Sequence, residues 1–99
     1  MKIWLDDIRH PPDATWVWEH DVIYAWQFVR NGVVKVISLD HDLGAEQPTG
    51  YDLLTWIEEY LETGQIIPAQ VPEFRIHSAN PVGRENMERV IQSIQRRMK

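Results

Sequence analysis

The sequence predicts a single α/β domain, residues 1–99, built around a parallel β-sheet. Segments of strand length alternate with amphipathic segments of helical length, in the order β, β, α, β, α, β, α. Strands separated by helices of about 10–15 residues form parallel sheets through right-handed crossovers. The length of 99 residues is that of one domain with one modest core.

The first part of the chain predicts two strands and a helix. Residues 2–5 are apolar and stop at two aspartates, which is typical of a buried strand that ends at a polar edge. Residues 9–13 contain two prolines and predict a loop. The β-branched and aromatic residues 15–18 predict a second strand. Asp21 is a suitable N-cap for a helix over residues 22–30.

The second part predicts two further strands and two helices. Residues 33–39 are almost continuously apolar, as expected for a strand covered on both faces. An apolar stripe at helical spacing predicts a helix over residues 50–63. Residues 65–72 contain two prolines and form a connector, and residues 74–77 predict the fourth strand. Asn80 can cap the final helix.

The composition excludes several classes of protein. The net charge of −5 argues against a protein that coats nucleic acid or an anionic membrane through bulk charge. The chain has no cysteine, which excludes disulfides, thiolate zinc sites and cysteine nucleophiles. No apolar run approaches the roughly 18 residues of a membrane span, and Met1 leads straight into a strand. We therefore expect a cytoplasmic protein with no targeting segment and no membrane partner.

Polar clusters follow three of the predicted strands. They are Asp6-Asp7, Asp40-His41-Asp42 and His77-Ser78-Ala79-Asn80. Because the carboxyl ends of parallel strands lie on one edge of the sheet, we expect these clusters to meet. Four converging carboxylates repel one another unless a cation neutralises them, and Mg²⁺ (or Mn²⁺) with oxygen ligands is the first choice. The alternative is that these residues are ordinary turn and cap residues.

These motifs resemble those of response-regulator receiver domains and, more closely, the cyclic-phosphate-processing receiver-like family. The similar stretches are Lys2-Ile3-Trp4-Leu5-Asp6-Asp7, Ile37-Ser38-Leu39-Asp40-His41-Asp42-Leu43-Gly44, Thr49-Gly50-Tyr51-Asp52-Leu53-Leu54 and His77-Ser78-Ala79-Asn80-Pro81. The resemblance covers essentially the whole chain. It implies a compact receiver-like (flavodoxin-like) three-layer sandwich with helices on both faces. The sheet would be a truncated parallel one with four strands in the order 2-1-3-4.

The resemblance also implies roles for particular residues. Asp6, Asp7 and Asp40 would hold a divalent ion, with Asp40 at the position where a receiver accepts phosphate, and Ser78 would contact a phosphoryl oxygen. Two features depart from receivers. A proline loop replaces the first crossover helix, and the chain ends before a fifth strand, so that the conserved lysine of receivers has no counterpart.

Other polar residues near the strand ends have two possible roles each. His41 and His77 suit proton transfer, since histidine titrates near neutrality, but side-chain alternation can turn both away from the site. Asp42 can offer the metal its carboxylate or its backbone carbonyl. Arg84 either binds a phosphate at the start of the last helix or pairs with a neighbouring glutamate. Asn80 can act as a helix cap, and Arg9 can close over a ligand or remain solvated.

The sequence thus predicts a metal-dependent site that handles phosphate, with a phosphoesterase acting on cyclic phosphates as the leading hypothesis. The substrate would be an RNA 2′,3′-cyclic end or a cyclic nucleotide. The predicted residues are Asp40, His41, His77 and Ser78 for catalysis, Ser78, Asn80, Arg84 and Arg9 for phosphate, and Asp6, Asp7, Asp40 and Asp42 for the metal. The alternative is a non-catalytic module that binds a nucleotide or a protein partner. A homodimer is also possible.

Overall fold

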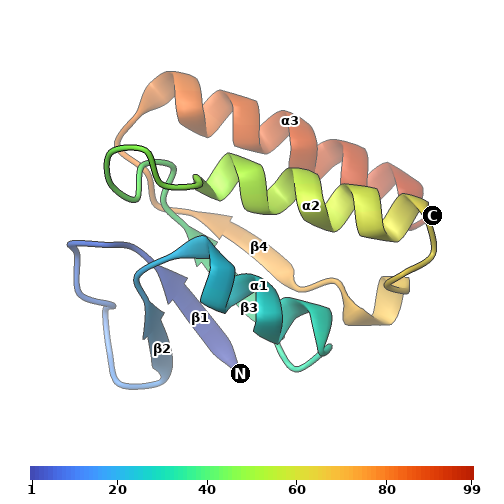
Figure 1. Cartoon of the computed structure of the whole chain (residues 1–99), viewed down its shortest axis with the longest axis horizontal. Helices are drawn as coiled ribbons and strands as arrows, with labels where there is room; N and C mark the ends of the chain where they lie inside the picture. Colours follow the sequence, from blue (N-terminus) through green and yellow to red (C-terminus); the bar gives the residue numbers. More distant parts are fainter.

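The computed structural model describes all residues, 1–99 (Figure 1). The elements are β1 (Lys2–Leu5), β2 (Trp16–Glu19), α1 (Val22–Arg30), β3 (Val36–Leu39), α2 (Gly50–Glu62), the 3₁₀ turn η1 (Pro68–Gln70), β4 (Glu73–Ile76) and α3 (Pro81–Arg97). Every predicted strand and helix is present. β3 begins three residues later than expected, and a 3₁₀ turn lies within the predicted connector. No helix is long and apolar enough to cross a membrane.

The four strands form one parallel sheet in the order β2-β1-β3-β4, which confirms the predicted order. The register aligns Leu5 with Leu39, and Leu39 with Ile76, so that the three strands end at the same level. The backbone N–H of Asp40 then donates to the carbonyl of Leu5, and that of His77 donates to Leu39, both at 3.0 Å. This register brings the three polar clusters to one edge of the sheet.

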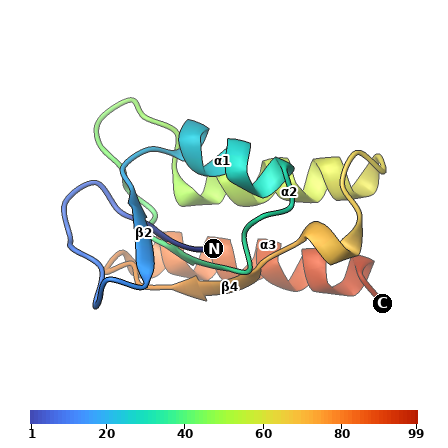
Figure 2. The ribbon, with the colours of Figure 1, turned by 90° about the horizontal axis from the view of Figure 1, so that it is seen from below.

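All three helices pack on the same face of the sheet. The side chains of Ile3 and Ile37 point to this face and join a core that contains Val22, Leu53 and Met87, one from each helix. Figure 2 shows α1 and α2 together on one side of the strands, and Figure 1 shows α3 running beside α2. The hydrophobic core therefore lies between the sheet and a single helical layer.

The opposite face of the sheet has no helix, which differs from the expected sandwich with helices on both faces. The β1–β2 connection is the one that crosses toward the other edge of the sheet, so a right-handed crossover places it on that face. Residues 6–15 make this connection as a loop, because Pro11 and Pro12 cannot continue a helix. We call this surface the helix-free face.

The N-termini of α2 and α3 lie at the carboxyl edge of the sheet (Figure 1). Thr49 caps α2 in a capping box with Asp52. Asn80 caps α3, as predicted, by accepting a 3.0 Å hydrogen bond from the backbone N–H of Gly83. The β3–α2 and β4–α3 loops are therefore each fixed at one end by a strand and at the other end by a capped helix.

Replacing Gly50 with alanine is expected to destabilise the fold by about 3 kcal/mol. A Cβ at this position would lie 2.2 Å from the carbonyl oxygen of Asp40, a backbone atom that the β3 ladder holds in place. Chemical denaturation measures the change in the free energy of unfolding. Gly64→Ala is the control, because a Cβ there meets nothing within 4 Å and costs only the strain of a φ of +77°, about 1 kcal/mol. Equal losses in the two variants would contradict the prediction.

Candidate functional site

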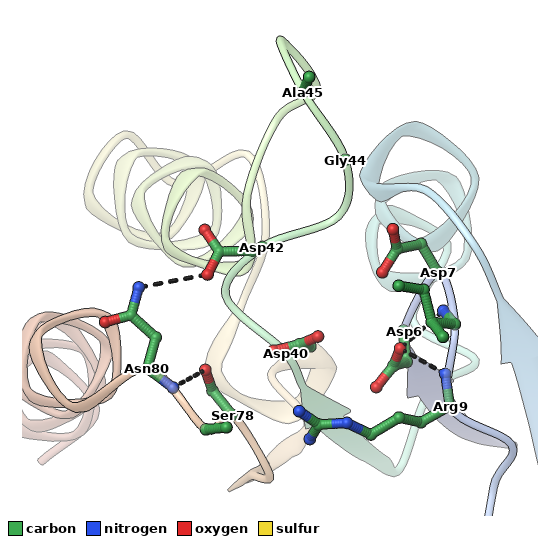
Figure 3. Close-up of a pocket in the computed structure, with 11 residues that line it drawn as sticks. Asp6, Asp7, Arg9, Asp40, Asp42, Gly44, Ala45, Ser78 and Asn80 are labelled. Atoms are coloured by element: carbon green, nitrogen blue, oxygen red, sulfur yellow. Dashed lines mark hydrogen bonds between the residues drawn. The ribbon is translucent and has the colours of Figure 1, made fainter.

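A cavity of about 550 Å³ opens at the carboxyl edge of the sheet. Its lining comes from the segments that follow β1, β3 and β4, as Figure 3 shows: Asp6, Asp7, Ile8, Arg9, Asp40, Asp42, Gly44, Ala45, Ser78, Ala79 and Asn80. The three polar clusters of the sequence therefore meet in space. The strand register accounts for this meeting, since each cluster directly follows a strand that ends at the same level.

Three of the lining carboxylates form a tight group. Asp6, Asp7 and Asp40 each present an oxygen, and these oxygens all lie within 4.8 Å of one another. Asp6 and Asp40 are buried, at 1% and 8% exposed, and Asp7 is half-buried. Arg9 is the single basic residue among the lining residues. One guanidinium does not balance this group of carboxylates, and these three residues could together hold a cation.

The carboxylate of Asp6 is fixed by hydrogen bonds from three donors. Its Oδ1 accepts from the backbone N–H groups of Ile8 and Arg9, both at 2.8 Å, and its Oδ2 accepts from Nε2 of His77 at 3.1 Å. Burial alone would raise the pKa of Asp6, but these backbone and side-chain hydrogen bonds together lower it. Asp6 is therefore ionised at neutral pH and held in one orientation.

His77 lies on the helix-free face and reaches the site only through Asp6. Its ring stacks on Trp4 with the ring centroids 3.7 Å apart, and its Nδ1 lies 2.7 Å from Oγ of Ser38. Burial lowers the pKa of His77, although the adjacent Asp6 opposes this effect. In the neutral ring, the Ser38 hydroxyl donates to Nδ1 and Nε2–H donates to Asp6. Both nitrogens are thus engaged, and the ring does not line the cavity.

The metal-free protein is expected to lose stability as the pH falls below about 6.5, the ordinary pKa of histidine. The folded pKa of His77 is lowered, so the unfolded chain binds a proton more readily and acid favours unfolding. The stability that neutral His77 contributes is fully present above the ordinary pKa of histidine. It is lost as the pH falls toward the pKa of His77 in the folded protein. Urea unfolding in a chelator at about pH 7.5 and about pH 5.5 measures it. His77→Gln should reduce the difference between the two pH values, and an undiminished difference would refute this account.

Ser78 and Arg9 are the lining residues best placed to meet a phosphate. The Ser78 oxygen accepts from the backbone N–H of Asn80 at 3.1 Å, which leaves its own proton free to donate into the cavity. The Arg9 side chain runs across the cavity toward Ser78 (Figure 3), and its Nη1 donates to the carbonyl of His77 at 3.0 Å. A hydroxyl and a guanidinium thus line the same cavity as the acidic group.

Asn80 and Asp42 line the cavity, but their polar atoms are used elsewhere. The Asn80 amide caps α3 and donates from Nδ2 to Oδ2 of Asp42 at 3.2 Å. Asp42 also contacts Nδ1 of His41 at 3.0 Å, and these bonds from His41 and Asn80 lower the pKa of Asp42. The carboxylate of Asp42 therefore points toward Asn80 and does not join the group of Asp6, Asp7 and Asp40 (Figure 3).

Two further candidate residues of the sequence lie outside the cavity. The ring of His41 packs on Gly83 at the start of α3, where an added Cβ would lie 2.5 Å from the His41 ring. Arg84 pairs with Glu88 one turn along α3, with a separation of 3.4 Å. Of the two possibilities for Arg84, the geometry is that of the glutamate pair.

Sequence reasoning missed two residues that support the site. Ser38 holds Nδ1 of His77, and Trp4 stacks on the ring while its Nε1 donates to the carbonyl of Arg9 at 3.0 Å. Ser38 is a polar residue inside an otherwise apolar strand and is 3% exposed. A buried hydroxyl requires a partner, and that requirement was the signal available in the sequence.

A parallel sheet ordered 2-1-3-4, with acidic residues after β1 and β3 and a hydroxyl after β4, matches the arrangement of the first four strands of a receiver fold. Residues 1–93 match the family described as the cyclic-phosphate processing receiver domain. The chain therefore belongs to this family, and the resemblance found in the motifs is confirmed. No curated protein and no solved structure matches the chain.

Proposed function

We propose that this receiver domain is a divalent-cation-dependent phosphoesterase that opens cyclic phosphates. The observation that carries the proposal is the cavity that three carboxylates, a guanidinium and a serine hydroxyl line together. An acidic cavity accepts a phosphate only when a cation offsets the carboxylates. The family description, which names cyclic-phosphate processing, supports the same class of substrate.

The donor set suits Mg²⁺ or Mn²⁺, which prefer oxygen ligands. Asp7 has no hydrogen-bond partner among the protein atoms, and Asp40 uses only Oδ1, which accepts from the backbone N–H of His41 at 2.8 Å. Asp6 is oriented by its three donors and still has lone pairs on Oδ2. Each of the three residues can therefore offer an oxygen to the same ion. When bound, the ion would offset phosphate charge and polarise the phosphorus centre.

The protein residues have separate roles in the proposed hydrolysis. Ser78 donates its hydroxyl proton to a non-bridging phosphate oxygen, and Arg9 pairs with a second one. Asp40 accepts a proton from the attacking water. One ring P–O bond breaks as the bond from water to phosphorus forms, and the leaving alkoxide takes up the proton that Asp40 accepted from the water. The product is a phosphomonoester with a free hydroxyl.

The test is hydrolysis of 2′,3′-cyclic and 3′,5′-cyclic mononucleotides with Mg²⁺, with Mn²⁺ and with a chelator. We expect turnover with metal and loss of turnover in the chelator. Absence of phosphomonoester with every metal and substrate would refute the enzymatic proposal.

A non-catalytic binding module is the second candidate. The observation in its favour is that neither His41 nor His77 lines the cavity, which leaves carboxylates as the bases among the lining side chains. In that case a cyclic nucleotide would raise the melting temperature in the presence of metal, and no product would form.

A further inference from the structure

The edge strand β2 holds the main chain of Asp6, although it contributes no residue to the lining of the cavity. The backbone N–H of Asp6 donates to the carbonyl of Glu19 at 3.1 Å. The carbonyl of Asp6 accepts from Nε1 of Trp18 at 2.6 Å. Both polar groups of the Asp6 backbone are therefore bound to the carboxyl end of β2, and the shorter of the two bonds comes from a side chain.

Asp40, another member of the acidic group, is held by a different strand. Its backbone N–H donates to the carbonyl of Leu5, which continues the ladder between β1 and β3. The carboxylate oxygens of Asp6, Asp7 and Asp40 lie within 4.8 Å of one another. Asp40 is thus bound to β1 and Asp6 is bound to β2, so the spacing of the oxygens depends on contacts with both strands.

The segment that carries these carboxylates needs such support, because the connection between β1 and β2 has no helix. Residues 6–9 begin this connection. The carbonyl of Arg9, at the end of the segment, accepts from Nε1 of Trp4 at 3.0 Å. Trp4 and Trp18 are partners in the register of β1 and β2, so two adjacent indoles of the helix-free face hold the two ends of the segment. Binding constellations work when their groups are held within about 0.5 Å of the required geometry.

The ring of Trp18 is itself fixed by aromatic neighbours. It contacts the exposed rings of His10 and His20, whose centroids lie 4.4 and 4.6 Å from its own. Trp16 lies two residues earlier on the same face of β2. Its ring meets the edge of Trp4 with centroids 5.8 Å apart and does not hold the segment of residues 6–9. The two tryptophans of β2 therefore differ in what their indoles support.

We propose that Trp18 is a positioning residue of the cation site, because its indole N–H holds the backbone of Asp6 at the distance from Asp40 that one ion requires. This proposal rests on the cation site of the proposed function and is independent of the hydrolysis. Trp18 acts only through Asp6. Without the indole donor, the carbonyl of Asp6 loses its partner in β2 and the carboxylate can shift away from Asp40. Supporting residues of this kind change metal affinity by about 10- to 100-fold.

The test is titration with Mn²⁺, in which electron paramagnetic resonance measures the free ion. Trp18→Phe keeps an aromatic ring beside His10 and His20 and removes the N–H donor. This variant should bind Mn²⁺ about tenfold more weakly than the unaltered chain. Trp16→Phe is the matched control, with the same substitution on the same face of the same strand, and it should bind Mn²⁺ as the unaltered chain does. Both variants should melt at similar temperatures in a chelator, since each loses one half-buried indole.

A second readout is spectroscopic and uses Mg²⁺. Each tryptophan gives one indole N–H signal in a ¹H–¹⁵N correlation spectrum, and the two phenylalanine variants assign the signals of Trp16 and Trp18. Addition of Mg²⁺ should shift the signal of Trp18, because its proton is bonded to the backbone of a proposed ligand. The signal of Trp16 should stay in place.

The outcomes separate this proposal from the proposed hydrolysis. Equal Mn²⁺ affinities of Trp16→Phe and Trp18→Phe would overturn the positioning role, as would a Trp18 signal that does not move at saturating Mg²⁺. If hydrolysis depended on metal in that case, the proposed function would stand. A chain that binds Mn²⁺ in a Trp18-dependent way but hydrolyses no cyclic nucleotide would refute only the proposed function. Absence of ion binding by the unaltered chain would overturn both.

Discussion

Replacing Asp40 with asparagine is expected to abolish the stabilisation of the protein by Mg²⁺ and to reduce hydrolysis of a cyclic nucleotide by at least about 100-fold. The amide oxygen of asparagine can still accept the hydrogen bond from the backbone N–H of His41, so the local fold is retained. What is lost is one of the three charges that converge within 4.8 Å. The same loss removes the base of the proposed reaction.

The metal-free variant gives a second signature. Without an ion, the three carboxylates repel one another, and removal of one charge relieves that repulsion. In a chelator, Asp40→Asn should therefore melt at the same temperature as the unaltered chain or higher, whereas Mg²⁺ should raise only the melting temperature of the unaltered chain. Asp42→Asn is the control, because the Asp42 carboxylate points away from the cluster. An undiminished Mg²⁺ shift in Asp40→Asn would exclude Asp40 as a ligand.

The sequence predicted the location of the site because that location depends on topology. A strand that ends at a polar cluster can be identified from residue types, and parallel strands bring such ends to one edge. The meeting of Asp6, Asp40 and Ser78 follows from this rule without any knowledge of side-chain conformation. The order of the strands came instead from the resemblance to receivers, and the register confirms it.

Side-chain directions at the ends of the strands were less predictable. Alternation applies only while a strand is regular, and His77 lies one residue beyond β4. Its ring follows the alternation, yet Nε2 still reaches Asp6, which follows β1 on the far side of β3. Asp42 was grouped with the other acids by its position in the chain, but its partners His41 and Asn80 determine where the carboxylate points. The spacing of residues along the sequence does not show which of several hydrogen-bond partners a side chain will select.

The single helical layer could have been inferred from strand patterns. In β1, Lys2 and Trp4 alternate with buried residues, and in β4 the sequence Glu-Phe-Arg-Ile alternates strictly. Alternation indicates a sheet with one face toward the core and the other toward solvent. The apolar run of residues 33–39 suggested two covered faces, but only its second half is β3.

Replacing His77 with alanine or with glutamine is expected to separate positioning from proton transfer. His77→Ala removes the donor to Oδ2 of Asp6, and loss of such a supporting bond weakens metal binding by about 10- to 100-fold. His77→Gln offers a side-chain amide that can donate to Asp6 in its place. Titration should then show that His77→Gln binds Mn²⁺ with an affinity within about fivefold of that of the unaltered chain, whereas His77→Ala does not.

The turnover of the glutamine variant tells the two roles apart. If His77 only positions Asp6, it contributes to turnover by improving metal binding. Saturating metal should then restore most of the turnover of His77→Gln. If the imidazole transferred a proton, turnover would fall by about 100-fold or more at saturating metal while affinity was preserved, because an amide cannot titrate. Ser38→Ala provides the intermediate case: it frees Nδ1 but keeps the bond to Asp6, so a loss smaller than that of His77→Ala is expected. The neutral, doubly hydrogen-bonded ring on Trp4 favours the positioning role.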